Sequence, residues 1–171
     1  VELNFMGYSP ARVVQKRIEM QKRNALLGLC GVASCRRQVI LEYFGDASEP
    51  CGNCDTCQTP PDTFDGTVAA QKAISCVYRT DQRFGVGYLT DVLLGQKVDD
   101  RIQNFGHDKI STFGIGTEYS KAEWQIIFRQ LVAQNLLVVD GEGHGGLKIT
   151  PQGQSFLKEK KELRLRKYTG K

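Results

Sequence analysis

Three cysteines of this chain lie close enough in sequence to share one metal ion. Cys51, Cys54 and Cys57 follow one another at intervals of three residues, in the stretch CGNCDTC. Thiolates at C-x2-C spacing are typical ligands of tetrahedral zinc, which needs four donors. Six cysteines in 171 residues are too few for a disulfide-stapled secreted domain. The spacing therefore predicts a metal site with one further ligand elsewhere in the chain.

The fourth ligand is expected to be Cys35 rather than Cys30. Cys35 falls at the predicted start of a helix, where the backbone amide dipoles favour a thiolate, whereas Cys30 falls near the end of the preceding helix, where they oppose one. Cys30 and Cys76 have apolar neighbours and are expected to be buried, unligated thiols. Zinc is the expected metal. An iron–sulfur cluster uses the same C-x2-C-x2-C run and stays the alternative.

Helical segments must bring these cysteines together. A serine–proline start at 9–10 predicts a helix to about residue 29, and a second helix is expected at about 34–44. Because a module as small as residues 1–57 forms only a thin core, metal binding is expected to supply much of its folding free energy. The stretch 58–66 holds two prolines and a glycine, and it reads as a linker.

The remainder of the chain has the element order of a winged helix. We expect helices at about 67–79, 87–94, 99–105 and 121–135, strands at 136–140 and 147–150 around a glycine-rich turn at 141–146, and a last helix capped by Thr150 that begins at Pro151. The fold class is therefore mostly α, within α+β. A helical zinc-binding module at 1–57 and a linker at 58–66 precede a winged helix with a β-hairpin wing at 67–157, and a basic tail or linker covers 158–171.

The helix at 121–135 is the most strongly marked. Ser120 and Glu123 have the spacing of a capping box. Trp124 and Phe128 lie on its apolar face, so we expect both rings in the core rather than stacked on nucleotide bases.

Charge is unevenly distributed along the chain. Residues 10–37 carry seven basic and one acidic residue, 38–66 carry six acidic and no basic residues, and 158–171 carry seven basic and two acidic residues. Residues 67–157 carry nine of each. This pattern allows a basic surface that binds a polyanion. No apolar run reaches the length of about 18 residues that a membrane span needs, and the first residues lack the layout of a signal peptide, so we expect a segment of an intracellular protein.

Several stretches resemble one known family. They are CRRQVILEYFGDASEPCGNCDTC at 35–57, DQRFGVGYLTDVL at 81–93, RIQNFGHDKISTFGIG at 101–116 and EWQIIFRQLVAQNLL at 123–137. Together they resemble the zinc-binding and winged-helix region of RecQ-type ATP-dependent DNA helicases, nearest the bacterial branch, over roughly residues 10–157. The resemblance implies one structural Zn2+ ion held by Cys35, Cys51, Cys54 and Cys57.

The resemblance also implies partners and a cellular role. In the family this region follows an ATP-driven motor that unwinds duplexes 3′ to 5′ in DNA repair and recombination, which implies duplex and forked DNA and the motor domains as partners. The resemblance further implies that the protein is bacterial, cytoplasmic and associated with the nucleoid. A single-stranded-DNA-binding protein is a further candidate class of partner, but no residues of the sequence point to it. No G-x-x-x-x-G-K phosphate loop occurs, so ATP and Mg2+ are expected only through the motor.

Four residues are the expected DNA contacts, with Arg101 and Lys109 first among them. Arg101, His107 and Lys109 fall in and after the expected recognition helix at 99–105, and Lys121 falls at the next helix start, where amides also favour phosphate. The expected role of His107 is hydrogen bonding beside Asp108 rather than catalysis.

A second class of function remains open. The balanced charge of 67–157 also fits a winged helix that binds a protein partner and has little direct contact with DNA. No paired carboxylates, nucleophile with a base, or open metal site is apparent, so no catalytic residue is predicted in this chain.

Overall fold

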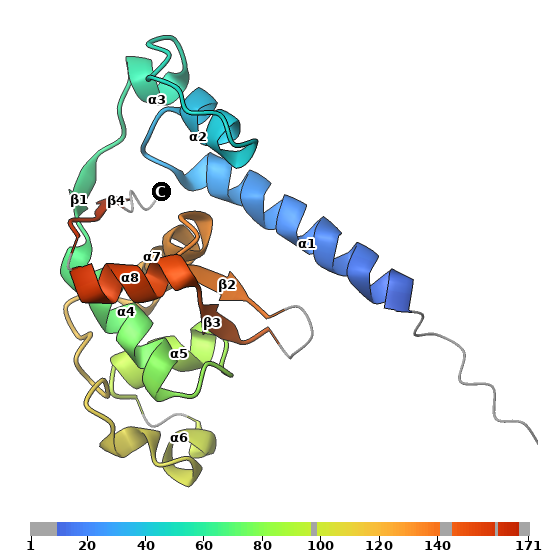
Figure 1. The fold of residues 1–171 in the computed structure, drawn as a ribbon. Helices are drawn as coiled ribbons and strands as arrows, with labels where there is room; N and C mark the ends of the chain where they lie inside the picture. The colour runs from blue at the N-terminus through green and yellow to red at the C-terminus, as the bar shows by residue number, and fades with distance from the viewer. Residues whose placement is uncertain (1–9, 97–98, 141–144, 160, 168–171) are drawn as a thin grey trace, which may run out of the picture.

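The structure, a computed structural model, describes residues 10–96, 99–140, 145–159 and 161–167 (Figure 1). Its elements, in chain order, are α1 (Pro10–Gly31), α2 (Arg36–Tyr43), α3 (Asp55–Gln58), β1 (Thr63–Asp65), α4 (Thr67–Arg79), α5 (Val86–Leu93), α6 (Asp100–Asn104), the 3-10 helix η1 (His107–Lys109), α7 (Lys121–Ala133), β2 (Leu137–Val139), β3 (Leu147–Ile149), α8 (Pro151–Glu159) and β4 (Arg164–Arg166). Across these ranges, no helix has the length and apolar character needed to cross a membrane.

The first three helices carry the cysteine-rich part of the chain. α1 is a long helix whose N-terminal half extends away from the other elements, and α2 and α3 lie together beyond its C-terminal end (Figure 1). α1 contacts α7. The expected helix to about residue 29 ends at Gly31, and Ser9, its expected cap, lies outside the described residues. The four-residue helix α3 was not expected.

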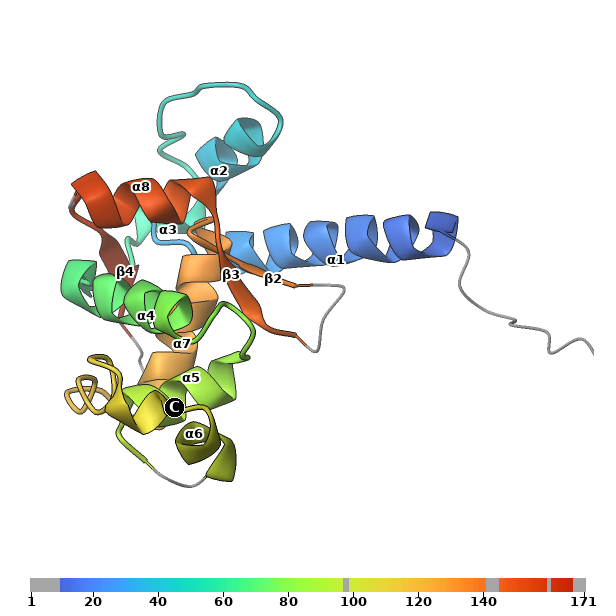
Figure 2. The same cartoon turned by 60° about the horizontal axis from the view of Figure 1, so that its bottom comes forward.

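Helices α4, α5 and α7 enclose the main core, and α8 and the hairpin of β2 and β3 complete it (Figure 2). The largest fully buried side chains include Trp124 and Phe128, which confirms that both rings are core residues. The Trp124 Nε1–H donates to the carbonyl of Gly116 at 2.7 Å. At the start of α7, the Ser120 hydroxyl and the Glu123 carboxylate form the expected capping box.

The wing is a two-stranded antiparallel hairpin, as predicted. Leu137 of β2 pairs with Ile149 of β3, and Val139 pairs with Leu147. Residues 141–144 of the expected turn lie outside the described residues. The Thr150 hydroxyl accepts a hydrogen bond from the Gly153 amide at 3.0 Å and so caps α8, as expected.

The expected linker at 58–66 and the expected tail at 158–171 each contain a short strand, and the two strands pair with each other. β1 pairs antiparallel with β4, with Phe64 opposite Leu165. Leu165 is fully buried and packs where a side chain on Gly66 would lie. The side chain of Gln130 in α7 bonds both backbone groups of Arg166, at 2.8 and 3.0 Å. Through these contacts β4 is anchored to the domain, and Leu165 belongs to the core.

The helix expected at 99–105 is also shorter than a recognition helix requires. It appears as the five-residue α6, followed by the single turn of η1. The helix directly before the wing is α7 instead, and most of its surface is covered by the core and by α1. Residues 99–109, here called the α6 segment, lie between α5 and α7 and consist of α6 and η1.

Candidate functional site

The structure brings the four predicted metal ligands into one cluster. The sulfur atoms of Cys35, Cys51, Cys54 and Cys57 all lie within 4.8 Å of one another. The sulfurs of Cys54 and Cys35 are 3.9 Å apart. A tetrahedral zinc ion with Zn–S distances of about 2.3 Å requires S–S distances of about 3.8 Å. The four sulfurs therefore fit a zinc ion with little movement.

Two short helices and one tight turn position the sulfurs. Cys35 is the N-cap of α2, as expected, and Cys54 is the N-cap of α3. Gly52 has φ +70°, a left-handed conformation that glycine adopts without a Cβ clash. Just before this turn, the Cys51 amide donates to the Cys35 sulfur at 3.3 Å.

The negative charge of the cysteine cluster favours a bound cation. The backbone amide of Cys51 lowers the pKa of Cys35 and favours its thiolate. The neighbouring sulfur of Cys54, together with burial, raises the pKa of Cys57 to about 12. Four thiolates this close repel one another, and a divalent cation removes that repulsion. The donor set is therefore suited to a bound metal.

Polar side chains brace the cluster. The Arg36 guanidinium bonds both oxygens of Asp55, at 2.6 and 2.8 Å, and also donates to the Leu29 carbonyl. It thus ties α2 to α3 and to the end of α1. The hydroxyl of Thr56 is buried and lies 2.8 Å from the Ser34 carbonyl. The side chain of Arg36 is therefore engaged within this module.

The remaining cysteines lie outside the cluster. Cys76 is fully buried in the main core, as predicted, and burial raises the pKa of its thiol to about 12. Cys30 is exposed, so the expectation that it is buried was wrong. It lies near the end of α1 and has apolar neighbours in sequence, but within the described part of the chain no element buries it.

Arg101 is held in a defined orientation at the start of α6. Asp99 is the N-cap of this helix and accepts a hydrogen bond from the Arg101 amide at 3.0 Å. The same carboxylate binds the guanidinium through Nε at 3.0 Å and Nη2 at 2.6 Å. The guanidinium also lies 5.4 Å from the ring centre of Tyr88. Arg101 is 62% exposed, so a phosphate can still reach it.

His107, the third expected DNA contact, is buried at 5% exposure. Its Nδ1 lies 2.6 Å from the hydroxyl of Tyr88. Burial lowers the pKa of His107 and raises the pKa of Tyr88 to about 12, so burial favours the neutral form of both groups. His107 therefore has the expected hydrogen-bonding role, with Tyr88 as its partner. The buried His107 side chain supports the α6 segment from its inner side.

The other two expected contacts lie on different elements. Lys109 ends η1, is exposed, and forms no ion pair with any residue that the structure describes. Lys121 begins α7, and its Nζ lies 2.7 Å from Asp91 of α5. The α6 segment thus carries Arg101 and Lys109 together, while Lys121 is tied to a neighbouring helix by a carboxylate.

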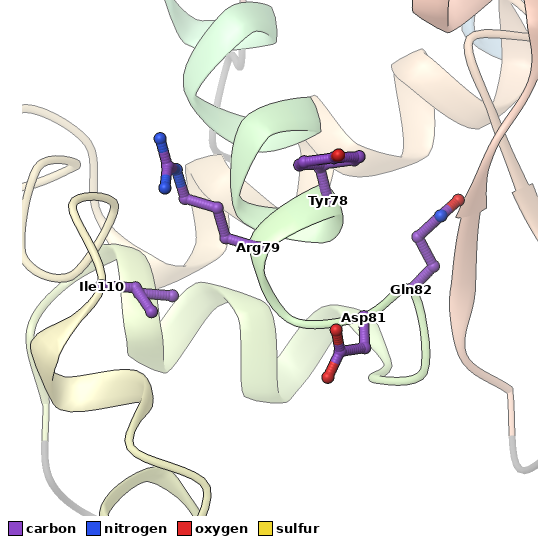
Figure 3. A pocket seen from close by; sticks show the side chains of 5 residues that line it. All are labelled: Tyr78, Arg79, Asp81, Gln82 and Ile110. Carbon is purple, nitrogen blue, oxygen red and sulfur yellow. The ribbon is translucent and has the colours of Figure 1, made fainter.

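A shallow depression lies beside the α6 segment (Figure 3). It has a volume of about 490 Å³ and is lined by Tyr78, Arg79, Asp81, Gln82 and Ile110. Tyr78 is 68% exposed. None of the expected DNA contacts lines this depression, although Ile110 directly follows Lys109.

Sequence reasoning missed the residues that support the α6 segment and the wing. They are Asp99, Tyr88, Phe84 and Gln82. Asp99 could have been found from the sequence, since an aspartate directly before a short helical stretch is a typical N-cap. The roles of Phe84 and Gln82 depend on contacts with residues far along the chain, which local patterns do not indicate.

Comparison with known families covers nearly the whole chain. Residues 2–58 match the family model described as RecQ zinc-binding, and residues 60–171 match the model described as the RQC domain.

Three bacterial relatives align over most of the chain. Each is named ATP-dependent DNA helicase RecQ. The relative from Haemophilus influenzae (strain ATCC 51907 / DSM 11121 / KW20 / Rd) is 39% identical over 156 residues, which are 88% of this chain and 25% of the relative. The relative from Pasteurella multocida (strain Pm70) is 37% identical over 153 residues, with 88% and 24% covered. The relative from Bacillus subtilis (strain 168) is 27% identical over 145 residues, with 84% and 24% covered. The chain spans about a quarter of the length of these relatives.

Proposed function

The chain belongs to the RecQ family, and we propose that it is the zinc-stabilised, DNA-binding accessory region of a RecQ-type helicase. In this proposal it grips duplex DNA beside the junction that an ATP-driven 3′ to 5′ motor unwinds during DNA repair and recombination. The motor domains of the same helicase and forked DNA are its partners. The place of action is the bacterial nucleoid in the cytoplasm.

One structural Zn2+ ion is the proposed cofactor, with Cys35, Cys51, Cys54 and Cys57 as its ligands. All four positions of a tetrahedral ion are then filled by protein sulfurs, as in structural rather than catalytic zinc sites. The ion holds the starts of α2 and α3 together. ATP and Mg2+ act only at the motor. Purified protein with one zinc per chain and no absorbance near 400 nm supports zinc over the iron–sulfur alternative.

The proposed phosphate contacts are Arg101, Lys109 and Lys121. The observation that carries the proposal is the exposure of Arg101 and Lys109 on one short segment between α5 and α7. Two exposed cations on one short segment suit the phosphates of a duplex backbone, whose binding is governed largely by counterion release.

A salt titration of fork-DNA binding tests this proposal. The logarithm of the binding constant is expected to fall with the logarithm of salt concentration, by about 0.9 per neutralised phosphate. Arg101→Ala and Lys109→Ala are each expected to weaken binding and to reduce that slope by about 1. Lys158→Ala, an exposed lysine at the end of α8, is the matched control.

The second candidate is a winged helix that binds a protein partner. Asp99 and Asp91 already pair with Arg101 and Lys121, which lowers the positive charge available to DNA. A single-stranded-DNA-binding protein is one such partner class. Fork affinity that is unchanged in both Arg101→Ala and Lys109→Ala would favour this candidate over the first.

A further inference from the structure

We propose that Gln82 and Phe84 are positioning residues that hold the wing hairpin and the α6 segment in one relative placement. Both lie in the loop between α4 and α5, here called the 80–85 loop. The inference rests on the proposed function, since the two parts it joins are those proposed to face DNA. Neither residue needs to touch DNA in this role.

The 80–85 loop binds the free edge of β3. β2 pairs with one edge of this strand, and the loop bonds the other. The Leu147 amide donates to the Phe84 carbonyl at 2.9 Å. Two residues further along β3, the Ile149 amide donates to the side-chain Oε1 of Gln82, also at 2.9 Å. The two bonds have the two-residue spacing of a sheet ladder, but a side chain supplies the second acceptor.

The loop leaves the end of α4 with a strained backbone. Asp81 has φ +58° and Gln82 has φ +56°, two consecutive left-handed residues that are not glycine. In Figure 3 the side chain of Gln82 extends from the loop toward the neighbouring strand, and that of Asp81 points away from it. Such strain costs free energy, and it persists where surrounding contacts fix the geometry.

A close backbone approach fixes the same junction. A Cβ atom on Gly146, at the start of β3, would lie 2.5 Å from the carbonyl oxygen of Arg83. Only glycine allows the wing to come this near the loop. The loop therefore contacts the wing at three residues, Gly146, Leu147 and Ile149, and these contacts fix the position of the wing.

The ring of Phe84 joins this loop to the α6 segment. It stacks on Tyr88 at 4.1 Å between ring centres, with an interplanar angle of 17°. It also meets His107 and Phe105 edge-on, at 5.2 and 5.4 Å. Aromatic pairs with these geometries add stability beyond their buried area. The carbonyl of Phe84 thus holds the wing, and its ring holds the α6 segment.

This arrangement has a consequence for binding. The wing carries Lys148, whose side chain is 51% exposed and pairs with Asp140, and the α6 segment carries Arg101 and Lys109. One duplex can contact both parts without further ordering only if their separation is already fixed in the free protein. Loosening the loop therefore weakens DNA binding without removing a charge.

Amide hydrogen exchange of Ile149, measured alongside fork-DNA affinity, tests the inference. Gln82→Ala removes the acceptor and is expected to speed exchange of this amide by about tenfold and to weaken fork binding by about three- to tenfold at an unchanged salt slope. Gln82→Glu keeps an acceptor oxygen and is expected to restore protection of the Ile149 amide. Gln154→Ala, an exposed glutamine of α8, is the control for both measurements.

The ring of Phe84 is tested separately by Phe84→Leu, which keeps the carbonyl. Fork binding is expected to weaken while the Leu147 and Ile149 amides stay protected. If the wild type binds fork DNA and both Gln82→Ala and Phe84→Leu bind it with the same affinity, the inference is overturned. An unchanged exchange rate of the Ile149 amide in Gln82→Ala would also overturn it. A wild-type protein that does not bind fork DNA would instead overturn the proposed function.

Discussion

The carboxylate of Asp99 accepts hydrogen bonds from two nitrogens of the Arg101 guanidinium, at 3.0 and 2.6 Å, and holds the guanidinium over the ring of Tyr88. This pair fixes the orientation of the arginine and also neutralises much of its charge. A phosphate that approaches Arg101 must therefore compete with Asp99. The α6 segment presents an oriented but weakened phosphate contact, which limits affinity.

Asp99→Asn is expected to strengthen fork-DNA binding by about two- to fivefold, the range expected for releasing an exposed ion pair. Asparagine is also a good N-cap, so α6 is expected to remain intact. Fluorescence anisotropy at two salt concentrations measures the change. The same substitution in an Arg101→Ala background serves as the control, where the gain is expected to vanish. Equal or weaker binding in Asp99→Asn would count against Arg101 as a phosphate contact.

Cys54→Ser is expected to reduce zinc content well below one ion per chain and to lower the melting temperature, because α2 and α3 lose the ion that joins them. Cys30→Ser, at an exposed cysteine outside the cluster, is expected to keep both at parental values. Zinc content is measured by atomic absorption and the melting temperature by circular dichroism. Full zinc content together with an unchanged melting temperature in Cys54→Ser would refute the assignment.

Leu165→Ala tests whether β4 belongs to the core. Leu165 is fully buried, so the substitution is expected to lower the free energy of unfolding by about 2–5 kcal/mol. Val68→Ala removes an apolar side chain that is 60% exposed on α4, and it is expected to cost less than about 0.5 kcal/mol. Urea unfolding measures both. If the two variants cost the same, residues 163–166 are the tail that their composition suggests.

The buried His107 predicts a pH dependence of stability. Burial lowers its pKa in the folded protein, whereas in the unfolded chain the pKa is about 6.5. The unfolded state then takes up the proton more readily, so the free energy of unfolding falls as pH drops below about 6.5. Urea unfolding at pH 7.5 and 5.5 should show a larger loss in the wild type than in His107→Gln, which keeps a hydrogen-bond acceptor for Tyr88. Equal losses would mean that His107 has the same affinity for protons in both states.

Local patterns predicted the parts of the fold that local interactions determine. The expected helix at 67–79 matches the bounds of α4, and the capping box of Ser120 and Glu123 marks the start of α7. The cysteine cluster was also predictable, because metal coordination restricts ligand types and spacing closely.

Pairings between distant segments could not be predicted in this way. β1 and β4 are three residues each, their partners lie about 100 positions apart, and Arg164 and Arg166 read as a charged tail. Only Leu165, between them, faces the core. The burial of His107 likewise depends on Tyr88 and Phe84, which the chain brings next to it from another helix and loop.

X-ray absorption at the zinc edge of the purified protein most directly tests the central claim that four cysteines of this chain bind one metal ion. The account predicts one zinc per chain with four sulfur neighbours at about 2.3 Å. Nitrogen or oxygen atoms in the first coordination sphere, fewer than four sulfurs, or iron in place of zinc would contradict it.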